Sequence, residues 1–413
     1  MGAWHALGYP ARGGWFSAAP KPARHAMLTL ASILVAALPT LLTAVFVIEV
    51  AAGLRSQRPS GRRVDEVDGV IVMPAHDEAL VIGRTLAGLR PALGPGMRML
   101  VVADNCRDDT AALALAAGAE VIVRSDPDRR GKGFALAFAR DHLRTAPPAC
   151  VAVIDADCEI DRASLERLFA TAADTGRPVQ AVNLLRPDLA ATPMVQVSNF
   201  AFMLKNLVRQ QGLARLSGQV NLTGTGMAFP WPIFAAAPLA TDDVVEDLGL
   251  GLDLSTSGRP PLLATDATVW SGASTAEGTL TQRTRWEGGF LATSGRRALP
   301  LAARGLRRGD LRLAWSGLSL AVPPLALLAL FNAATAAIGL VLLAAGANPA
   351  PLLVQLGVGV LAGTGIVAVW CRFGRPFLSA RSAARLPMYV LWKLPMYLGL
   401  ARRGPQGWLR AGR

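Results

Sequence analysis

The sequence predicts an α/β fold, a doubly wound and mostly parallel sheet, in a chain that also carries transmembrane and interfacial helices. Two observations predict the sheet: short apolar runs alternate with stretches of helix-forming composition between residues 64 and 291, and polar clusters directly follow those runs. A third predicts the membrane helices. The chain is 52% hydrophobic and only 17% charged, a balance that membrane spans explain better than a large soluble core.

Four apolar runs of strand length are expected to be parallel strands buried on both faces, since continuous branched runs are typical of such strands. They cover residues 70–73, 99–102, 120–123 and 151–154. Helices are expected between them over 79–89, 109–117 and 133–143. The alternation predicts parallel strands joined by crossover helices, a fold in which ligands bind beyond the carboxyl ends of the strands.

Polar clusters follow all four predicted strands and should therefore converge at one edge of the sheet. They cover residues 74–78, 104–109, 124–132 and 155–157. A dinucleotide-binding domain is the competing interpretation, but the Gly-x-Gly-x-x-Gly turn expected after its first strand is absent. The clusters therefore predict a ligand site of another kind.

A pair of membrane spans is expected after the sheet. No charged side chain occurs between Leu313 and Cys371, and a turn rich in Gly and Pro divides this stretch. Each half exceeds the ~20 apolar residues that a bilayer crossing needs. We therefore predict a transmembrane hairpin made of residues 313–345 and 352–371.

The other segments complete the expected organisation. A tail over 1–26 precedes a transmembrane anchor over 27–54, and the α/β domain covers 64–291. Residues 292–312, where apolar and basic side chains mix, are expected to form an amphipathic interface helix. Residues 372–413 are expected to form a basic cytoplasmic tail, in which 386–400 is an interfacial or re-entrant helix.

The net charge of +13 is concentrated at the carboxyl end of the chain. No acidic residue follows Asp310, and ten basic residues do, which leaves about +3 for the remainder. Basic residues flank both ends of the predicted hairpin, so the positive-inside bias places both ends in the cytoplasm. We interpret the charge as membrane topology and lipid contact, not nucleic-acid binding. The chain is expected to be a multi-pass protein of the cell (inner) membrane, with its α/β domain in the cytoplasm.

Blocks of residues between 70 and 286 occur in an order that resembles the family 2 glycosyltransferases with a GT-A fold. The blocks are Pro74-Ala-x-Asp-Glu78, Asp104-Asn-x-x-Asp-Asp-Thr110, Arg130-Gly-Lys-Gly133, Asp155-Ala-Asp157, and Glu246-Asp247 with Gln282-Arg-Thr-Arg-Trp286. The resemblance is to the membrane-embedded branch that includes cellulose, chitin and hyaluronan synthases and ceramide glucosyltransferase. It implies an inverting transfer of a sugar from a nucleotide-diphosphate sugar, expected to be a UDP-sugar.

Asp155 and Asp157 are the expected metal site. They offer hard oxygen ligands at the end of a predicted strand, which suits Mg²⁺ or Mn²⁺. Such an ion neutralises the charge that develops on a diphosphate leaving group. The resemblance implies that Asp157 binds the metal directly and that Asp155 faces both the nucleotide ribose and the metal.

Asp247 is the expected general base, because it matches the second acid of the family's Glu-Asp motif. Inversion needs a base that accepts the proton of the attacking acceptor hydroxyl. Glu246 is expected to support Asp247 or to hold a neighbouring loop. Asp242 and Asp243 are close enough in sequence to compete for the role.

The donor nucleotide is expected over the first two strand ends. By resemblance, Asp104 is the acid that contacts uracil, and Ala75 and Glu78 line the same pocket. Asp77 stands where the family usually has Asn, a departure that bears on the nucleotide contacts. Lys132, between two glycines that permit close backbone approach, is expected to meet the base or the phosphates.

The Gln-x-x-Arg-Trp block is expected to close the site on the acceptor side. Gln282 and Arg285 can bind the diphosphate, a task that suits the planar guanidinium group. Trp286 can stack on the acceptor sugar. The loop of Gly224, Thr225 and Gly226 is expected to form the floor beneath it.

The expected function is transfer to a lipid-linked or glycan acceptor at the cytoplasmic face. Polysaccharide synthases of the resembling branch thread their product through a channel built from more than three spans. Processive synthesis would therefore need an export partner or an oligomer, whereas a lipid acceptor fits three spans. Two interpretations from other classes remain: a nucleotidyltransferase, or a non-catalytic membrane transport or scaffold subunit.

Overall fold

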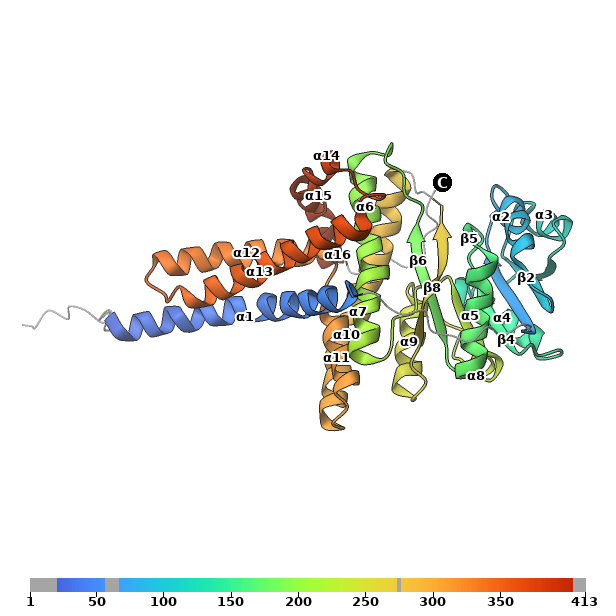
Figure 1. Cartoon of the computed structure of the whole chain (residues 1–413), viewed down its shortest axis with the longest axis horizontal. Coiled ribbons are helices and arrows are strands. Elements are labelled where there is room, and N and C mark those ends of the chain that lie inside the picture. The colour runs from blue at the N-terminus through green and yellow to red at the C-terminus, as the bar shows by residue number, and fades with distance from the viewer. Residues whose placement is uncertain (1–20, 56–66, 273–275, 404–413) are drawn as a thin grey trace, which may run out of the picture.

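The computed structural model describes residues 21–55, 67–272 and 276–403. An α/β domain lies at one end of the molecule and three long helices extend from the other, with a layer of crossing helices between them (Figure 1). The strands are β1 (Gly69–Ala75), β2 (Met97–Asp104), β3 (Glu120–Arg124), β4 (Cys150–Val153), β5 (Cys158–Ile160), β6 (Val179–Leu185), β7 (Met227–Pro230) and β8 (Leu262–Ser271).

Within the described residues these strands form one sheet in the order β3-β2-β1-β4-β7-β6-β8-β5. β1 pairs in parallel with β2 and β4, and β2 with β3, so the predicted doubly wound half of the sheet is confirmed. β7 is antiparallel to both β4 and β6, whereas β6 and β8 are parallel. This reversal after β4 makes the sheet mixed and lies outside the strands expected from the sequence.

The helices of the α/β domain are α2 (Ile82–Leu89), η1 (Arg90–Ala92), α3 (Thr110–Ala116), α4 (Lys132–Leu143), α5 (Arg162–Thr175), α8 (Trp231–Ala236) and α9 (Glu246–Thr256). They cover both faces of the sheet. On one face, Ile71 and Met73 belong to a core that includes Phe169 of α5. On the other, Val70 and Val72 belong to a core that includes Leu136 of α4. Strands buried on both faces explain why their sequences are continuously apolar.

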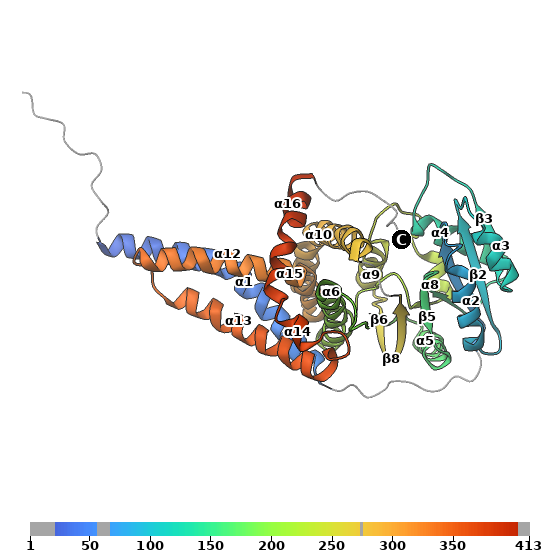
Figure 2. The ribbon, with the colours of Figure 1, turned by 90° about the horizontal axis from the view of Figure 1, so that it is seen from above.

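The remaining helices form two parts: the layer of crossing helices next to the sheet domain, called the crossing layer, and the bundle of three long helices. They are α1 (Lys21–Gly53), α6 (Pro193–Met203), the π-helical turn η2 (Leu204–Arg209), α7 (Gln210–Ser217), α10 (Ala276–Arg307), α11 (Leu311–Ala321), α12 (Leu325–Ala344), α13 (Ala350–Val369), the π-helical turn η3 (Trp370–Gly374), α14 (Ala380–Ala383), α15 (Leu386–Trp392) and α16 (Leu394–Arg403). In Figure 1, α10 and α11 run across the direction of the three long helices, and Figure 2 shows from above how the long helices extend away from the sheet.

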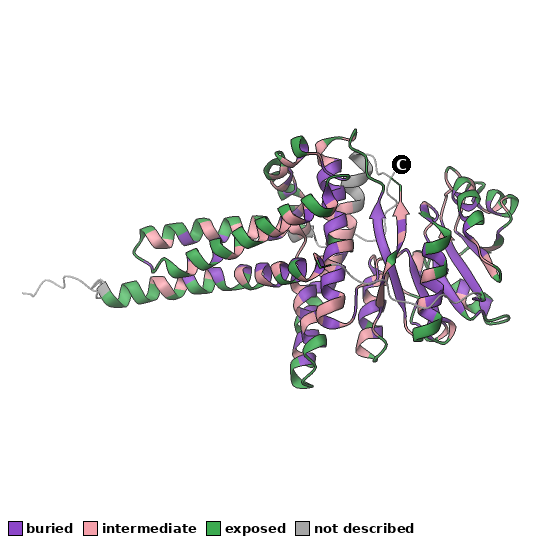
Figure 3. Ribbon diagram, viewed as in Figure 1, coloured by how far each residue is buried: buried purple, intermediate pink, exposed green. Residues whose placement is uncertain are grey.

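Three described helices, α1, α12 and α13, are long and apolar enough to cross a membrane. Their outward faces are exposed in the isolated chain, while the strands are buried (Figure 3). Polar contacts join them internally: Asn332 Nδ2 donates to Thr43 Oγ1 at 2.9 Å, and Gln355 Nε2 donates to Thr335 Oγ1 at 2.7 Å. Such contacts are typical of helix association where water is absent.

The boundaries around the predicted hairpin differ from expectation in two places. The predicted span 313–345 is broken, because Pro323 and Pro324 cannot donate helical hydrogen bonds, so α11 ends at Ala321 and α12 starts at Leu325. The predicted interface helix 292–312 is not separate either. It is the second half of α10, which runs without interruption from Ala276 to Arg307, and α11 folds back against it.

The carboxyl-terminal end of α1 packs closely against η2 and α7 of the crossing layer. Gly53 lies directly against the Val208 carbonyl, and Gly212 lies directly against the Glu49 carbonyl, so neither position has room for a Cβ. Glu49, fully buried, forms an ion pair with Arg209 at 2.7 Å. The bundle is therefore packed rigidly onto the helices that border the site.

Candidate functional site

A cavity of about 1380 Å³ begins at the carboxyl ends of β1, β2 and β4 and continues to the near ends of α1 and α12. The expected site residues in its wall are Ala75, Glu78, Asp104, Lys132, Asp155, Asp157, Gly224, Thr225, Glu246, Asp247, Arg285 and Trp286. Apolar residues line it toward the bundle: Phe46, Leu325, Leu386 and Val390. One continuous space therefore connects the strand ends with the long helices.

Lys132, the first residue of α4, lies in the cavity wall and contacts two other site residues. Its ammonium group forms an ion pair with Asp155 and donates to the Gly224 carbonyl at 2.5 Å. Burial opposes the charged form, but Asp155, Glu246 and Asp247 outweigh it, and the pKa of Lys132 is raised. A charged Lys132 thus holds the loop of residues 224–226, called the glycine loop, against the end of β4.

Glu246 and Asp247 form the first turn of α9, where the helix dipole favours negative charge. Burial, and then the neighbouring charge of Asp247, raises the pKa of Glu246 to about 8. Burial also raises the pKa of Asp247, against the hydrogen bond from the Leu248 N–H at 2.8 Å and the charges of Lys132 and Lys205. Asp247 is therefore a stronger base than an ordinary aspartate, beside a carboxyl group that retains its proton near neutral pH.

Gly224 lies against Asp247 in a conformation that favours glycine. Its φ is +83°, and a Cβ at this position would lie 3.2 Å from Asp247 Oδ2. The loop can therefore approach the carboxylate only because position 224 has no side chain.

Asp155 and Asp157 lie on the connection between β4 and β5, with Cys158 beside them. Ligand atoms of these three residues lie within 4.8 Å of one another. Burial raises the pKa of the Cys158 thiol well above its usual value, and this thiol donates to Asp157 Oδ1 at 3.5 Å. A protonated thiol is a poor metal ligand, so the available donors are the carboxylate oxygens, which suit Mg²⁺ or Mn²⁺ better than Zn²⁺.

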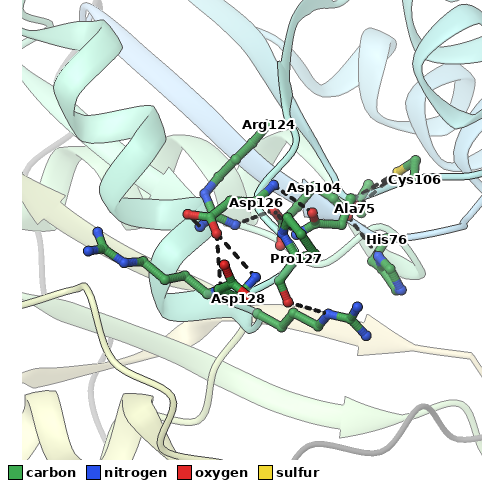
Figure 4. Close-up of polar contacts among 11 residues, drawn as sticks. Ala75, His76, Asp104, Cys106, Arg124, Asp126, Pro127 and Asp128 are labelled. Carbon is green, nitrogen blue, oxygen red and sulfur yellow. Dashed lines mark hydrogen bonds and ion pairs between the residues drawn. The ribbon is translucent and has the colours of Figure 1, made fainter.

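The donor end of the cavity contains a buried ion pair that the sequence analysis did not anticipate (Figure 4). Arg124 donates to Asp104 Oδ1 at 2.6 Å and to Asp126 Oδ2 at 3.0 Å. Burial raises the pKa of Asp104 despite this guanidinium group. The signal was available, because Asp104 and Arg124 end neighbouring parallel strands in direct register. His76 also fixes this corner, since its Nδ1 lies 2.7 Å from the Asp104 carbonyl.

Three expected site residues are not placed in the cavity wall. Asp77 turns toward the loop after β2, where its carboxylate accepts from the Arg107 N–H at 2.6 Å. Gly226 packs against Val269 behind the glycine loop. Gln282 belongs to α10, but its side chain lies outside the described residues.

The Gln-x-x-Arg-Trp block lies on α10, where Arg285 and Trp286 reach the cavity. Burial lowers the pKa of Arg285, and the negative charges of Glu246 and Asp155 oppose this shift. The guanidinium group is therefore close enough to interact with both carboxylates. Trp286 packs on Phe202 with ring centroids 5.9 Å apart. Arg283, not expected as a site residue, covers both rings at 4.8 Å from Phe202 and 5.3 Å from Trp286. The Trp286 ring is therefore held from two sides.

A polar network fixes the other side of α10 to the end of the chain. Glu287, the residue after Trp286, forms an ion pair with Lys393 and accepts from the Tyr397 hydroxyl at 2.6 Å. Both charged side chains are buried, with 14% and 4% of their surfaces exposed. No sequence motif marks this network, because α10 and α16 are far apart along the chain.

Comparison with known proteins gives one family match and several relatives. Residues 70–230 match the family "Glycosyl transferase family 2". An uncharacterised glycosyltransferase of Mycobacterium tuberculosis is 37% identical over 100 residues, which are 24% of this chain and 41% of that protein. An uncharacterised glycosyltransferase of Mycobacterium bovis matches to the same extent. The chain thus spans about two fifths of the length of the curated relatives it matches.

A solved structure of similar fold covers nearly the whole chain. The mannosyltransferase of Pyrobaculum calidifontis, in complex with GDP-Man and Mn²⁺, has a TM-score of 0.55 and 16% identity. The match covers 89% of this chain and 99% of that one. This coverage is much larger than residues 70–230, the stretch that matches the family. The similarity in fold therefore extends beyond that stretch.

Proposed function

We propose that the protein is a membrane-bound inverting glycosyltransferase. The premise is that residues 70–230 of this chain form a family 2 glycosyltransferase domain. The protein transfers a sugar from a nucleotide-diphosphate sugar, preferably a UDP-sugar, to a lipid-linked or glycan acceptor. The observation that carries the proposal is the single cavity in which Asp157, Asp247 and Trp286 lie together. Residues distant in sequence thereby share one space large enough for a sugar and its nucleotide.

A divalent ion is the proposed cofactor, and Asp157 and Asp155 would hold it. Their oxygens fit a hard cation, and the similar mannosyltransferase is in complex with Mn²⁺. When bound, the ion neutralises charge on the diphosphate oxygens. Lys132, already paired with Asp155, and Arg285, whose charge faces the same carboxylates, add positive charge where the leaving group departs.

Asp247 is the proposed general base. The acceptor oxygen attacks the anomeric carbon as the bond to the diphosphate breaks, and the hydroxyl proton passes to Asp247. The nucleoside diphosphate leaves with the electron pair of the broken bond, and the anomeric configuration inverts. Glu246, neutral near pH 7 because burial raises its pKa to about 8, spares Asp247 a second negative neighbour.

The bundle end of the cavity supports a lipid acceptor. Phe46 of α1 and Leu325 of α12 line it, and both helices are candidate membrane spans. A lipid chain could therefore remain beside the spans while its polar end reaches Trp286 and Asp247. The basic flanks of the spans support a cytoplasmic position for the sheet domain.

Product analysis tests the proposal directly. Membranes containing the chain are incubated with a series of labelled UDP- and GDP-sugars and Mg²⁺ or Mn²⁺, and the lipid extract and any polymer are examined by mass spectrometry. We expect a glycolipid of inverted anomeric configuration, and Asp157→Ala should lose metal-dependent nucleotide binding. Retained configuration, pyrophosphate release or the absence of any glycosylated product would contradict the proposal.

A further inference from the structure

A lysine outside every recognised motif faces the acceptor side of the cavity. Lys205 belongs to the π-helical turn η2, a type of distortion that is frequent at functional sites. Its side chain is exposed to the interior of the cavity. The ammonium group lies over the face of Phe290, 5.3 Å from the ring centroid, and the charges of Asp247 and Glu287 also act on it. Within the described ranges, no carboxylate forms an ion pair with Lys205.

The other cations near Lys205 divide into two kinds. Arg209 is neutralised by Glu49, and Lys393 by Glu287. Arg283, in contrast, donates to uncharged atoms of Ser198, to Oγ at 2.9 Å and to the carbonyl at 3.4 Å. Burial lowers the pKa of both Lys205 and Arg283. Lys205 and Arg283 both line the cavity without a described salt bridge, and together they form a site that an anion would stabilise.

The cavity continues from these polar groups into apolar walls. Phe46, Leu325 and Val390 line the part next to the long helices. An occupant that spans both parts must have an anionic polar end and a hydrocarbon chain. A phosphate meets the first requirement with oxygens that can face an ammonium group and a guanidinium group together.

We propose that the acceptor is a phosphate-bearing lipid whose phosphate group binds between Lys205 and Arg283, on the membrane side of Asp247. The inference rests on the proposed function, because it names the class of acceptor for the same site. Asp247 then receives the proton of a hydroxyl group on the same headgroup, which the bound phosphate positions. In this arrangement Lys205 acts on substrate binding and not on the chemical step.

Lipid binding and sugar transfer, measured separately on the full chain in micelles of an uncharged, phosphate-free detergent, test the inference. The probes are phosphatidylglycerol, a polyprenyl phosphate, diacylglycerol and water-soluble glycerol phosphate. We expect binding of both phosphate-bearing lipids but transfer only to phosphatidylglycerol, because polyprenyl phosphate has no alcohol hydroxyl that Asp247 could deprotonate. Lys205→Met should weaken that binding roughly 10- to 100-fold, as for loss of a charge-assisted hydrogen bond. Lys205→Arg should retain it.

Arg259→Met, which removes an exposed positive charge elsewhere, is the matched control and should bind as the unaltered chain does. Nucleotide binding should be equal in all variants. Equal binding of diacylglycerol and phosphatidylglycerol, or a Lys205→Met variant that changes only the pH profile of transfer, would overturn the inference. Lys205-dependent lipid binding without transfer from any donor would instead refute the proposed function and leave the phosphate site standing.

Discussion

The two ends of the cavity are built in different ways. At the donor end, Ala75, Asp104, Lys132 and Asp157 lie on consecutive strand ends within about a fifth of the chain, and each belongs to a short motif. At the acceptor end, the wall combines side chains from α1, η2, α10, α12 and α15. The difference teaches that the donor site follows from sheet topology, whereas the acceptor site depends on how separate helices pack.

The electrostatics of the two ends differ in the same sense. Cations at the donor end are matched with carboxylates, as in Arg124 with Asp104 and Lys132 with Asp155. At the acceptor end, Arg209 and Lys393 are matched in the same way, but Lys205 and Arg283 have no described salt bridge. The proposed phosphate would supply the missing negative charge there. Variants that affect one end and spare the other would sharpen this contrast.

The largest expected effect is on the chemical step, at the junction of the two ends. Asp247→Asn removes the proposed base and keeps the shape of the side chain, so the transfer rate should fall by about 10² to 10⁴. Nucleotide binding should change little, because the donor end is intact. Transfer rates and nucleotide affinity measured on the same preparation check this. A variant with near-normal transfer would show that another group takes the proton.

The next effect should be on the stability of the acceptor end alone. Lys393→Met leaves Glu287 as a buried charge with one hydroxyl donor, a change that costs about 3–5 kcal/mol for a buried pair. Hydrogen exchange should therefore accelerate in α15 and α16, while β1 to β4 stay protected. The double variant Glu287→Leu with Lys393→Met is the control and should recover much of the loss. Uniform acceleration over the whole chain would contradict separate stability of the two ends.

A pH-dependent effect follows from Glu246. Its pKa is about 8 in the folded protein and about 4.5 when exposed, so the folded state binds more protons between these values. The contribution of Glu246 to stability is therefore most favourable below pH about 4.5 and falls as pH rises toward 8, with a slope of up to about 1.4 kcal/mol per pH unit. Thermal unfolding of the metal-free protein across this range measures it. Glu246→Gln should flatten the profile, and identical profiles would contradict the assignment.

The sequence predicts the donor end of the cavity better than the acceptor end. Val70 and Val151 were expected in parallel strands because strands buried on both faces are continuously apolar. The antiparallel β7 was not expected, because a strand of four residues that leads directly into α8 carries no periodic signal. Asp155, Asp157 and Asp247 were placed in one site by motif order, and the shared cavity supports that prediction.

The acceptor end could not be predicted in the same way. Lys205 and Arg209 are spaced as neighbours on a helix surface, a pattern typical of a solvated face. Their position in the cavity wall depends on α1 packing against η2 and α7, a contact between segments that no local pattern connects. The pairing of Glu287 with Lys393 likewise depends on the return of the chain after α13.

The smallest expected effect on the transfer rate is that of a substitution at Gly224. This residue lies where the two ends of the cavity meet, so its substitution separates them most sharply. Gly224 accepts a hydrogen bond from Lys132 of the donor site and lies against Asp247. Gly224→Ala introduces a Cβ at a φ of +83° and 3.2 Å from Asp247 Oδ2, so strain of roughly 1–2 kcal/mol must be relieved by a small shift of the loop.

We expect this shift to lower the transfer rate about 10-fold, since roughly 1.4 kcal/mol corresponds to that factor. Gly258→Ala is the matched control, because Gly258 has a similar φ of +81° with open space around it. It carries the backbone strain without the contact with Asp247. Loss of transfer in Gly224→Ala alone would therefore locate the effect at the carboxylate. Equal losses in both variants would assign it to general backbone strain and remove the argument that the loop positions the base.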